Sequence, residues 1–294
     1  MCDEKTLEQW ASYLKDAPPI SRRKLGSLTA GAGLAAALSP VAGAQFRPVS
    51  TGNVEIETPD GVADCFMAHS PDGSYPGVIV WPDILGLRPA FMDMGRRLAL
   101  AGYAVLVVNP FYRNGRAPVV AEGASFNDPA VRELVMPMAR SLNAETHFTD
   151  ARAFVEYLDG HGSVAKDRKI GTIGYCMGGP MVMRTAAARP DRIGAGASFH
   201  GGGLATDAAD SPHRLIPEMD AEFLIAIAEN DDASDPAAKE TLRESFAAAD
   251  LAAEIEVYSG AQHGWCVPDS TVYHEEQAER AWSRLTALFE RALA

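Results

Sequence analysis

The sequence predicts a single α/β domain built on a doubly wound, mostly parallel sheet. Apolar, β-branched runs recur along the chain and alternate with helical patterns, which is typical of this class. Several of these runs are apolar throughout, as expected for strands that are buried on both faces. About 250 residues follow an N-terminal leader, a length that suits one domain with one large core.

The individual elements follow from the same patterns, taken in chain order. The predicted strands are residues 77–81, 103–108, 169–174, 194–199, 223–228 and 254–258. The predicted helices are residues 90–101, 144–158, 179–188, 237–249 and 273–293. Ligands of such sheets bind beyond the carboxyl ends of the strands, so the residues that directly follow each strand are the first candidates for a site.

Two further segments complete the domain. Residues 54–57 and 63–68 flank the turn signal Pro59-Asp60-Gly61 and predict an antiparallel hairpin at the sheet edge. Residues 109–127 form a loop rich in Gly, Pro and Arg. No repeat or long linker divides residues 45–294, which we therefore treat as one domain.

Residues 1–44 have the pattern of an export signal. Ser21-Arg22-Arg23-Lys24-Leu25 precedes an uncharged stretch rich in Ala, Gly and Leu, which ends in Ala42-Gly43-Ala44. The paired arginines resemble the twin-arginine signal of bacterial export, so we expect a periplasmic or secreted protein from which residues 1–44 are removed. The apolar stretch is too weak for a stable membrane span. The alternative is a structural N-terminal helix with an incidental arginine pair.

Charge and cysteine content exclude several classes of partner. The net charge is −13, and no basic patch offsets it, which argues against binding to nucleic acid or to an anionic membrane surface. Four cysteines without a CxxC pair or a His/Cys cluster form neither a disulfide framework nor a zinc site. We expect no metal and a monomer.

The strand at 169–174 runs into Gly174-Tyr175-Cys176-Met177-Gly178-Gly179 and then into a helix. This is the nucleophile elbow of α/β-hydrolases, with Cys176 at the position usually held by Ser. The sulfur of Cys176 would lie at a helix N-terminus, where the dipole and the free N–H groups favour a thiolate. A small cysteine buried in a tight turn is the alternative, and the flanking glycines argue against it.

A nucleophile needs a base, and in this fold the chain order is nucleophile, acid, histidine. The strand at 254–258 is followed by His263, our candidate base, and His200 after another strand is a weaker candidate. The strand at 223–228 is followed by Asp231, which we prefer as the acid over Asp232 and Asp235. The expected oxyanion donors are the backbone N–H groups of Met177 and Ile84.

Together, the elbow at Cys176, the acid near Asp231 and the sequence His263-Gly264-Trp265 resemble the dienelactone hydrolase family. Residues 78–86, 101–103 and 109–113 support the resemblance, which covers about residues 52–294. It implies an α/β-hydrolase fold without a large cap domain. It also implies hydrolysis of an enol lactone or related ester through a thioester intermediate, with a small-molecule substrate and no metal or organic cofactor.

Two positions depart from the family pattern. The family places a Glu close to the nucleophile where this chain has Asp83, whose side chain is one methylene shorter; Asp83 could instead cap the turn at residues 84–86. The family also holds the substrate carboxylate with two arginines. Arg113 or Arg116 could supply one, but the expected position of the second is Val267, which cannot form a bidentate clamp.

The remaining candidate residues define the expected mouth of the site and its alternatives. We expect Trp265, Phe111, Tyr112 and Arg113 to line the mouth, which suits a small planar lactone or an aryl ester.

Cys65 is expected to be a buried small residue, and a Cys176–Cys266 disulfide is disfavoured because it would trap the nucleophile. The alternatives are a general aryl or alkyl esterase, an inactive binding protein on a hydrolase scaffold, and thiol redox chemistry at Cys176, which lacks a resolving CxxC partner.

Overall fold

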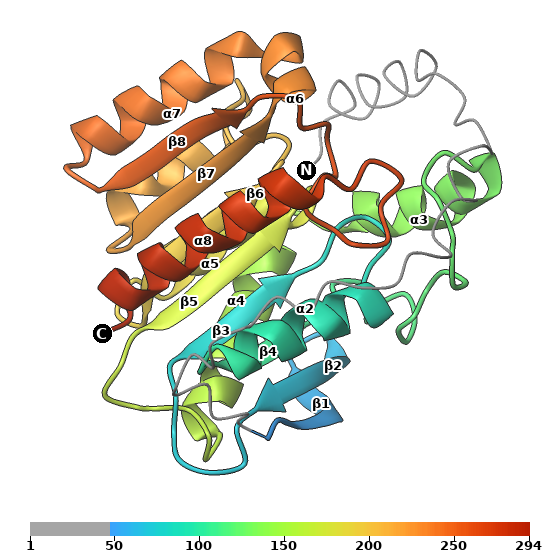
Figure 1. Cartoon of the computed structure of the whole chain (residues 1–294), viewed down its shortest axis with the longest axis vertical. Coiled ribbons are helices and arrows are strands. Elements are labelled where there is room, and N and C mark those ends of the chain that lie inside the picture. The colour runs from blue at the N-terminus through green and yellow to red at the C-terminus, as the bar shows by residue number, and fades with distance from the viewer. Residues whose placement is uncertain (1–47) are drawn as a thin grey trace, which may run out of the picture.

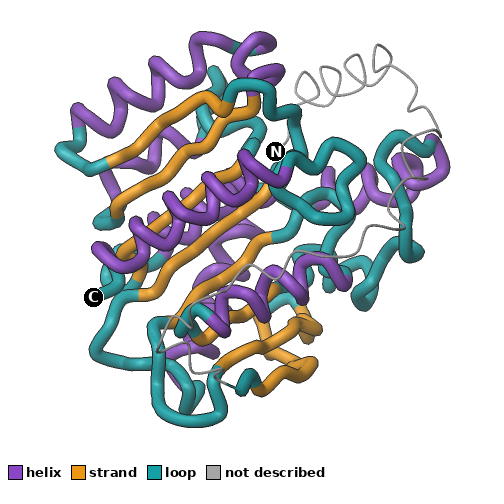
Figure 2. The backbone as a smooth tube through the Cα atoms, viewed as in Figure 1, coloured by secondary structure: helices purple, strands orange, loops and turns teal. Residues whose placement is uncertain are grey.

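A computed structural model describes residues 48–294 as an eight-stranded sheet with helices on both faces (Figures 1 and 2). The strands are β1 (Ser50–Thr58), β2 (Gly61–His69), β3 (Gly77–Trp81), β4 (Ala104–Val107), β5 (Ile170–Tyr175), β6 (Ile193–Phe199), β7 (Glu222–Ala228) and β8 (Ala253–Tyr258). The helices are α2 (Pro89–Leu100), α3 (Pro129–Ser141), α4 (Ala144–Gly160), α5 (Gly178–Ala188), α6 (Glu229–Ser234), α7 (Pro236–Ala248), α8 (Glu275–Ala292) and the 3₁₀ helix η2 (Pro212–Glu218).

The strand order is β1-β2-β4-β3-β5-β6-β7-β8. All neighbouring pairs from β4 to β8 are parallel, whereas β1 and β2 form an antiparallel hairpin and β2 is antiparallel to β4. The predicted doubly wound, mostly parallel sheet is therefore confirmed, with the hairpin at its edge. The wholly apolar runs predicted as central strands are buried on both faces, as in β3 and β6.

Each face of the sheet has its own apolar core. Side chains of α3, α4, α5 and α7 pack on one face, and side chains of α2 and α8 pack on the other. Figure 1 shows α2 and α8 lying in front of the sheet with α4 and α5 behind it. Caps fix where several helices begin: Asn143 and Thr146 form a capping box at the start of α4, and Asp128 accepts a hydrogen bond from Ala130 N–H at the start of α3.

The structure differs from the sequence prediction at several boundaries. The hairpin strands β1 and β2 extend beyond the predicted segments, because their exposed outer residues carry no apolar signal. Helix α3 was not predicted, since Pro137 interrupts its interior and weakens the helical pattern. The segment that contains Asp231 is the short helix α6, and no helix was predicted there.

The parallel arrangement brings the segments that follow β3, β5, β6, β7 and β8 to one edge of the sheet.

The predicted export signal, residues 1–44, lies outside the described residues. Among the described residues, no helix is both long enough and apolar enough to cross a membrane.

Candidate active site

Cys176 lies in the sharp turn between β5 and α5. Its φ of 54° is in the left-handed region, where non-glycine residues are uncommon and strained. Its backbone N–H donates to Phe199 O at 3.0 Å, which fixes the turn against the end of β6. Because α5 begins at Gly178, the sulfur lies at the N-terminus of this helix, where partial positive charge stabilises an anion.

The glycines around Cys176 are required by close backbone contacts. A Cβ at Gly174 would lie 2.3 Å from Gly178 O, and a Cβ at Gly178 would lie 2.4 Å from Trp81 O. Neither side chain could be accommodated without moving backbone atoms. The elbow therefore packs directly against the carboxyl end of β3, where Ile84 follows.

His263 and Asp231 are in direct contact. His263 Nδ1 lies 2.8 Å from Asp231 Oδ2, and His263 N–H donates to Asn230 Oδ1 at 2.7 Å. Asp232 points elsewhere, because both of its oxygens accept hydrogen bonds from Lys239 Nζ at 2.6 and 2.7 Å. The structure thus pairs the preferred acid with the preferred base, and it adds Asn230 as a residue that holds the histidine loop.

His200 connects the nucleophile turn to the histidine loop. It follows Phe199, whose carbonyl oxygen binds Cys176, and its ring lies 4.9 Å from the His263 ring in an edge-to-face arrangement. His200 is buried, and burial lowers its pKa well below the usual value, so the ring is neutral at neutral pH. The His200 backbone φ of 42° is a feature that the sequence did not indicate.

The two expected oxyanion donors lie at the same edge. Met177 directly follows Cys176 and precedes α5, and Ile84 lies in the turn after β3. Among residues 48–294, neither the Met177 N–H nor the Ile84 N–H donates to a protein acceptor. Two such amides beside a nucleophile are the arrangement that stabilises a developing oxyanion.

Comparison with known proteins agrees with this geometry. The model of the dienelactone hydrolase family matches residues 64–293, which is most of the chain. The chain belongs to the dienelactone hydrolase family. Membership supports an enzyme that hydrolyses a lactone or ester bond, and it confirms the resemblance inferred from the elbow and the histidine loop.

Individual members of the dienelactone hydrolase family are distant in sequence. A protein of Methylorubrum extorquens named provisionally as a carboxymethylenebutenolidase is 25% identical over 281 residues, with 92% of this chain and 93% of that protein covered. The carboxymethylenebutenolidase of Rhodococcus opacus is 26% identical over 230 residues, with 77% and 85% covered. A crystal structure of a provisionally named dienelactone hydrolase from Klebsiella pneumoniae superimposes with a TM-score of 0.71 at 24% identity, covering 83% of this chain and 99% of that one, and shows the shared fold.

Asp83 occupies the position where the family places a Glu, and its contacts match the alternative role of a turn residue. Its carboxylate accepts hydrogen bonds from Leu85 N–H at 2.9 Å and from both terminal nitrogens of Arg88 at 2.6 and 2.9 Å. Arg88 is buried and also binds Asp269 in the loop that follows His263. The structure therefore ties Asp83 into a bridge between the β3 turn and the histidine loop, which the sequence did not reveal.

Tyr112 and Arg113 were both expected to bind substrate. In the structure both side chains form hydrogen bonds with the buried carboxylate of Asp150. The Arg113 guanidinium donates to Asp150 at 2.6 and 2.9 Å and to Asp60 at 2.6 and 3.0 Å. The Tyr112 hydroxyl donates to Asp150 at 2.8 Å. These contacts tie the loop after β4 to α4 and to the hairpin turn. The charge of Arg113 is neutralised by two carboxylates.

The other predicted lining residues also lie elsewhere. Trp265 is fully buried, stacked on Tyr258 and edge-on to His200, so the expectation that it lines the mouth is wrong. Phe111 is likewise fully buried, and Arg116 is exposed and pairs with Glu55 on the surface. The sequence places these residues after strands, but it does not show which way their side chains point.

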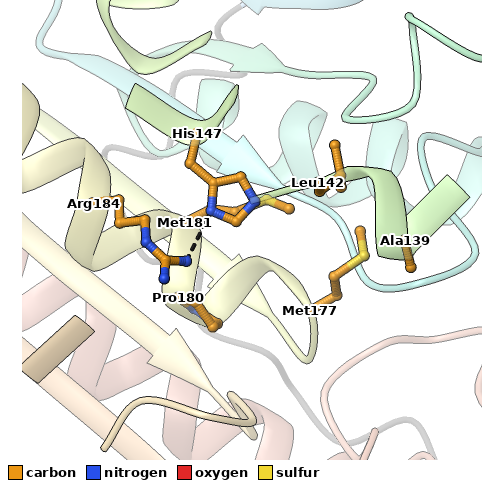
Figure 3. Close-up of a pocket in the computed structure, with 7 residues that line it drawn as sticks. All are labelled: Ala139, Leu142, His147, Met177, Pro180, Met181 and Arg184. Atoms are coloured by element: carbon orange, nitrogen blue, oxygen red, sulfur yellow. Dashed lines mark hydrogen bonds between the residues drawn. The ribbon is translucent and has the colours of Figure 1, made fainter. Parts of the chain in front are cut away.

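A small cavity lies beside Met177, between α3, α4 and α5 (Figure 3). Its volume is about 10 Å³, enough for about one water molecule and too little for a substrate. On its wall the buried Arg184 approaches His147 Nδ1 at 3.0 Å and donates to Asp210 O at 2.9 Å. Burial, and then the charge of Arg184, lower the pKa of His147 well below its usual value.

The three described cysteines are all reduced thiols. Cys65, Cys176 and Cys266 are all buried and none is in a disulfide. Burial raises the pKa of Cys65 to about 12 and that of Cys266 well above its usual value, so both are neutral thiols. Of these three, only Cys176 lies at a helix N-terminus.

Proposed function

We propose that this member of the dienelactone hydrolase family cleaves a lactone or carboxylic ester with Cys176 as nucleophile, His263 as base and Asp231 as the residue that orients the base. The observation that carries the proposal is the 2.8 Å contact between His263 Nδ1 and Asp231 at the edge of the sheet where the strained Cys176 turn lies. A nucleophile, a base and a group that orients the base are the three parts that covalent catalysis requires.

The chemistry follows from these positions. With Nδ1 bonded to Asp231, His263 takes the thiol proton at Nε2 as the Cys176 sulfur attacks the carbonyl carbon. The carbonyl oxygen becomes an oxyanion that accepts hydrogen bonds from Met177 N–H and Ile84 N–H. The carbon–oxygen bond to the leaving group then breaks, His263 protonates the leaving oxygen, and a thioester remains on Cys176.

Hydrolysis of the thioester repeats the sequence with water. His263 removes a proton from water as the water oxygen attacks the thioester carbon. Collapse of the second tetrahedral intermediate breaks the carbon–sulfur bond, and His263 returns the proton to the Cys176 sulfur. The acid is released and the enzyme is restored, so no cofactor is needed.

The substrate that we propose is a neutral lactone or ester. Val267, at the position of the expected second arginine, is apolar and buried, and Arg113 already binds Asp150 and Asp60. A carboxylate on the substrate would therefore lack the paired cation clamp. Dienelactone-like acids are expected to be hydrolysed with a poor KM, and neutral esters to compete well.

The first experiment tests the nucleophile. Turnover of p-nitrophenyl acetate should be lost in Cys176→Ala and after treatment of the wild type with iodoacetamide, whereas Cys65→Ser should retain activity. An active, folded Cys176→Ala protein would overturn the mechanism. If the wild type hydrolyses none of a broad panel of esters, the alternative that the protein is an inactive binding protein on a hydrolase scaffold would be favoured.

The second experiment tests the charge of the substrate. We expect kcat/KM for a lactone bearing a free carboxylate to be no higher than that for its methyl ester. A preference for the acid above about a hundredfold, or about 2.7 kcal/mol, would mean that a second cation replaces the missing arginine.

We also propose that residues 1–44 direct export through the twin-arginine route. A reporter fused to these residues should be exported, and the change of Arg22 and Arg23 to Lys should stop its export. Equal export of both reporters would point to another route.

A further inference from the structure

A second cavity lies on the face of the sheet that α2 and α8 cover, away from the pocket in Figure 3. Its volume is about 200 Å³. It is enclosed by four residues of α2, by the ends of β5 and β6, by the loop after His263 and by four residues of α8. Figure 1 shows α2 and α8 in front of the sheet, and residues of both helices line the cavity.

Four aromatic residues contribute to the walls, beside aliphatic and charged ones. Tyr175 stacks on Phe199 with ring centroids 5.1 Å apart and an angle of 17° between the rings. Trp282 and Tyr273 line the cavity from α8 and from the loop before it. Flat aromatic walls of this kind favour a flat, apolar ligand.

Tyr175 contributes a hydroxyl group to the lining of this cavity. Tyr175 is 5% exposed. Burial raises its pKa well above the usual value, so the group is a neutral O–H that can donate. A hydroxyl in a largely apolar space favours a ligand that offers it an acceptor, because the hydrogen bond adds to the affinity.

The charges at the rim argue against an anionic ligand. Arg97 donates to Glu279 through two nitrogens at 2.7 and 2.5 Å and lies over the Trp282 ring at 4.0 Å. Its charge is thus balanced by a carboxylate. Asp93, which also lines the cavity, forms an ion pair with Arg96 at 2.5 Å, so neither arginine is left to bind an anion.

We propose that this cavity is a binding site for a neutral, single-ring aromatic compound whose hydroxyl or carbonyl oxygen accepts a hydrogen bond from Tyr175. A cavity of about 150 Å³ with apolar walls holds a benzene molecule, so about 200 Å³ accommodates a ring with one substituent. The site is distinct from the candidate catalytic site. It also adjoins that site, since Tyr175 precedes Cys176 and Cys266 lies three residues after His263.

Phenol is the probe and toluene is the comparison without a hydroxyl. Calorimetry and the fluorescence of Trp282 should both show saturable binding of phenol to the wild-type protein, with weaker binding of toluene and weaker binding still of benzoate. Tyr175→Phe should lower phenol affinity about fivefold, the usual effect of one hydrogen bond, and leave toluene affinity unchanged.

A matched pair of variants on α8 locates the binding. Ala281 lines the cavity, so Ala281→Leu should fill it and abolish phenol binding. Ala287 is exposed on the same helix, and Ala287→Leu should bind phenol like the wild type. Absence of saturable phenol binding, or unchanged binding in Ala281→Leu, would overturn the proposal. If Ala281→Leu does not fold, an equal loss of phenol and toluene affinity in Tyr175→Phe would overturn it as well.

Discussion

Asp231 and Asp232 are neighbours on α6, and their contacts distinguish them. Asp231 lies 2.8 Å from His263 Nδ1, whereas Asp232 is held by Lys239 on α7. The order of residues along the chain was enough to select His263, because only one histidine directly follows the last strand. It favoured Asp231 without excluding its neighbour, since the direction of a side chain on one turn of helix depends on the packing of that turn.

Substitution of the two aspartates provides a matched test at the residue scale. Asp231→Asn should lower kcat by about 10³- to 10⁴-fold, because the amide no longer holds His263 in the required tautomer. Asp232→Asn removes one ion pair with Lys239 and should change kcat less than about threefold. Steady-state kinetics of both variants decide the assignment, and a greater loss in Asp232→Asn would reverse it.

Elements, rather than single residues, determine where the sequence prediction succeeded and failed. The glycine spacing around Cys176 predicted the elbow, because only glycine tolerates the backbone contacts of Gly174 and Gly178. The expectation that Arg113, in the loop after β4, binds substrate was not supported. Arg113 binds Asp150 on α4, which is more than 30 residues away in the chain. Contacts between distant elements leave no local pattern in one sequence.

The close packing of the elbow predicts how the start of α5 responds to a substitution at Gly178. In Gly178→Ala the new Cβ would lie 2.4 Å from Trp81 O and 3.0 Å from Pro82 O, so the start of α5 must move away from β3. We expect lower thermal stability and loss of most activity, since the Met177 and Ile84 amides then separate. Gly162→Ala is the control, because a Cβ there meets no atom within 4 Å. Wild-type activity in Gly178→Ala would show that the elbow tolerates this shift.

At the scale of the whole molecule, buried neutral histidines make stability depend on pH. Burial lowers the pKa of His147 and of His200 well below the usual value, whereas in the unfolded chain both titrate near their ordinary value of about 6.5. Below that pH the unfolded state binds protons that the native state does not. Stability from these two groups is therefore complete above about pH 6.5 and falls as the pH decreases.

Denaturant unfolding of the wild type and of His200→Asn between pH 5 and pH 7.5 tests this dependence. Asparagine tolerates the left-handed backbone of this position and does not titrate. The variant should lose less stability on acidification, with the difference approaching about 1.4 kcal/mol per pH unit at the acidic end. Parallel pH curves for the two proteins would show that His200 titrates alike in the folded and unfolded states.

The fold class could be predicted from the sequence, and so could the candidate residues Cys176, Asp231 and His263, because each prediction depends on local pattern and chain order. The lining of the site could not be predicted, since Trp265 and Tyr112 turn into the interior through contacts with other elements. The bridge from Asp83 through Arg88 to Asp269 joins two segments that are far apart in the sequence. It could therefore be recognised only in the folded structure.

A covalent thioester on Cys176 is the central claim, and trapping it is the most direct measurement. Rapid acid quenching of the enzyme during turnover of p-nitrophenyl acetate, followed by peptide mass spectrometry, should show one acetyl group on the peptide that contains Cys176. In the Asp231→Asn variant both acylation and deacylation should be slower, and any acetyl group should again be on the peptide that contains Cys176. Full turnover with no acetyl group on Cys176 in either protein, or with the acetyl group on another residue, would contradict the account.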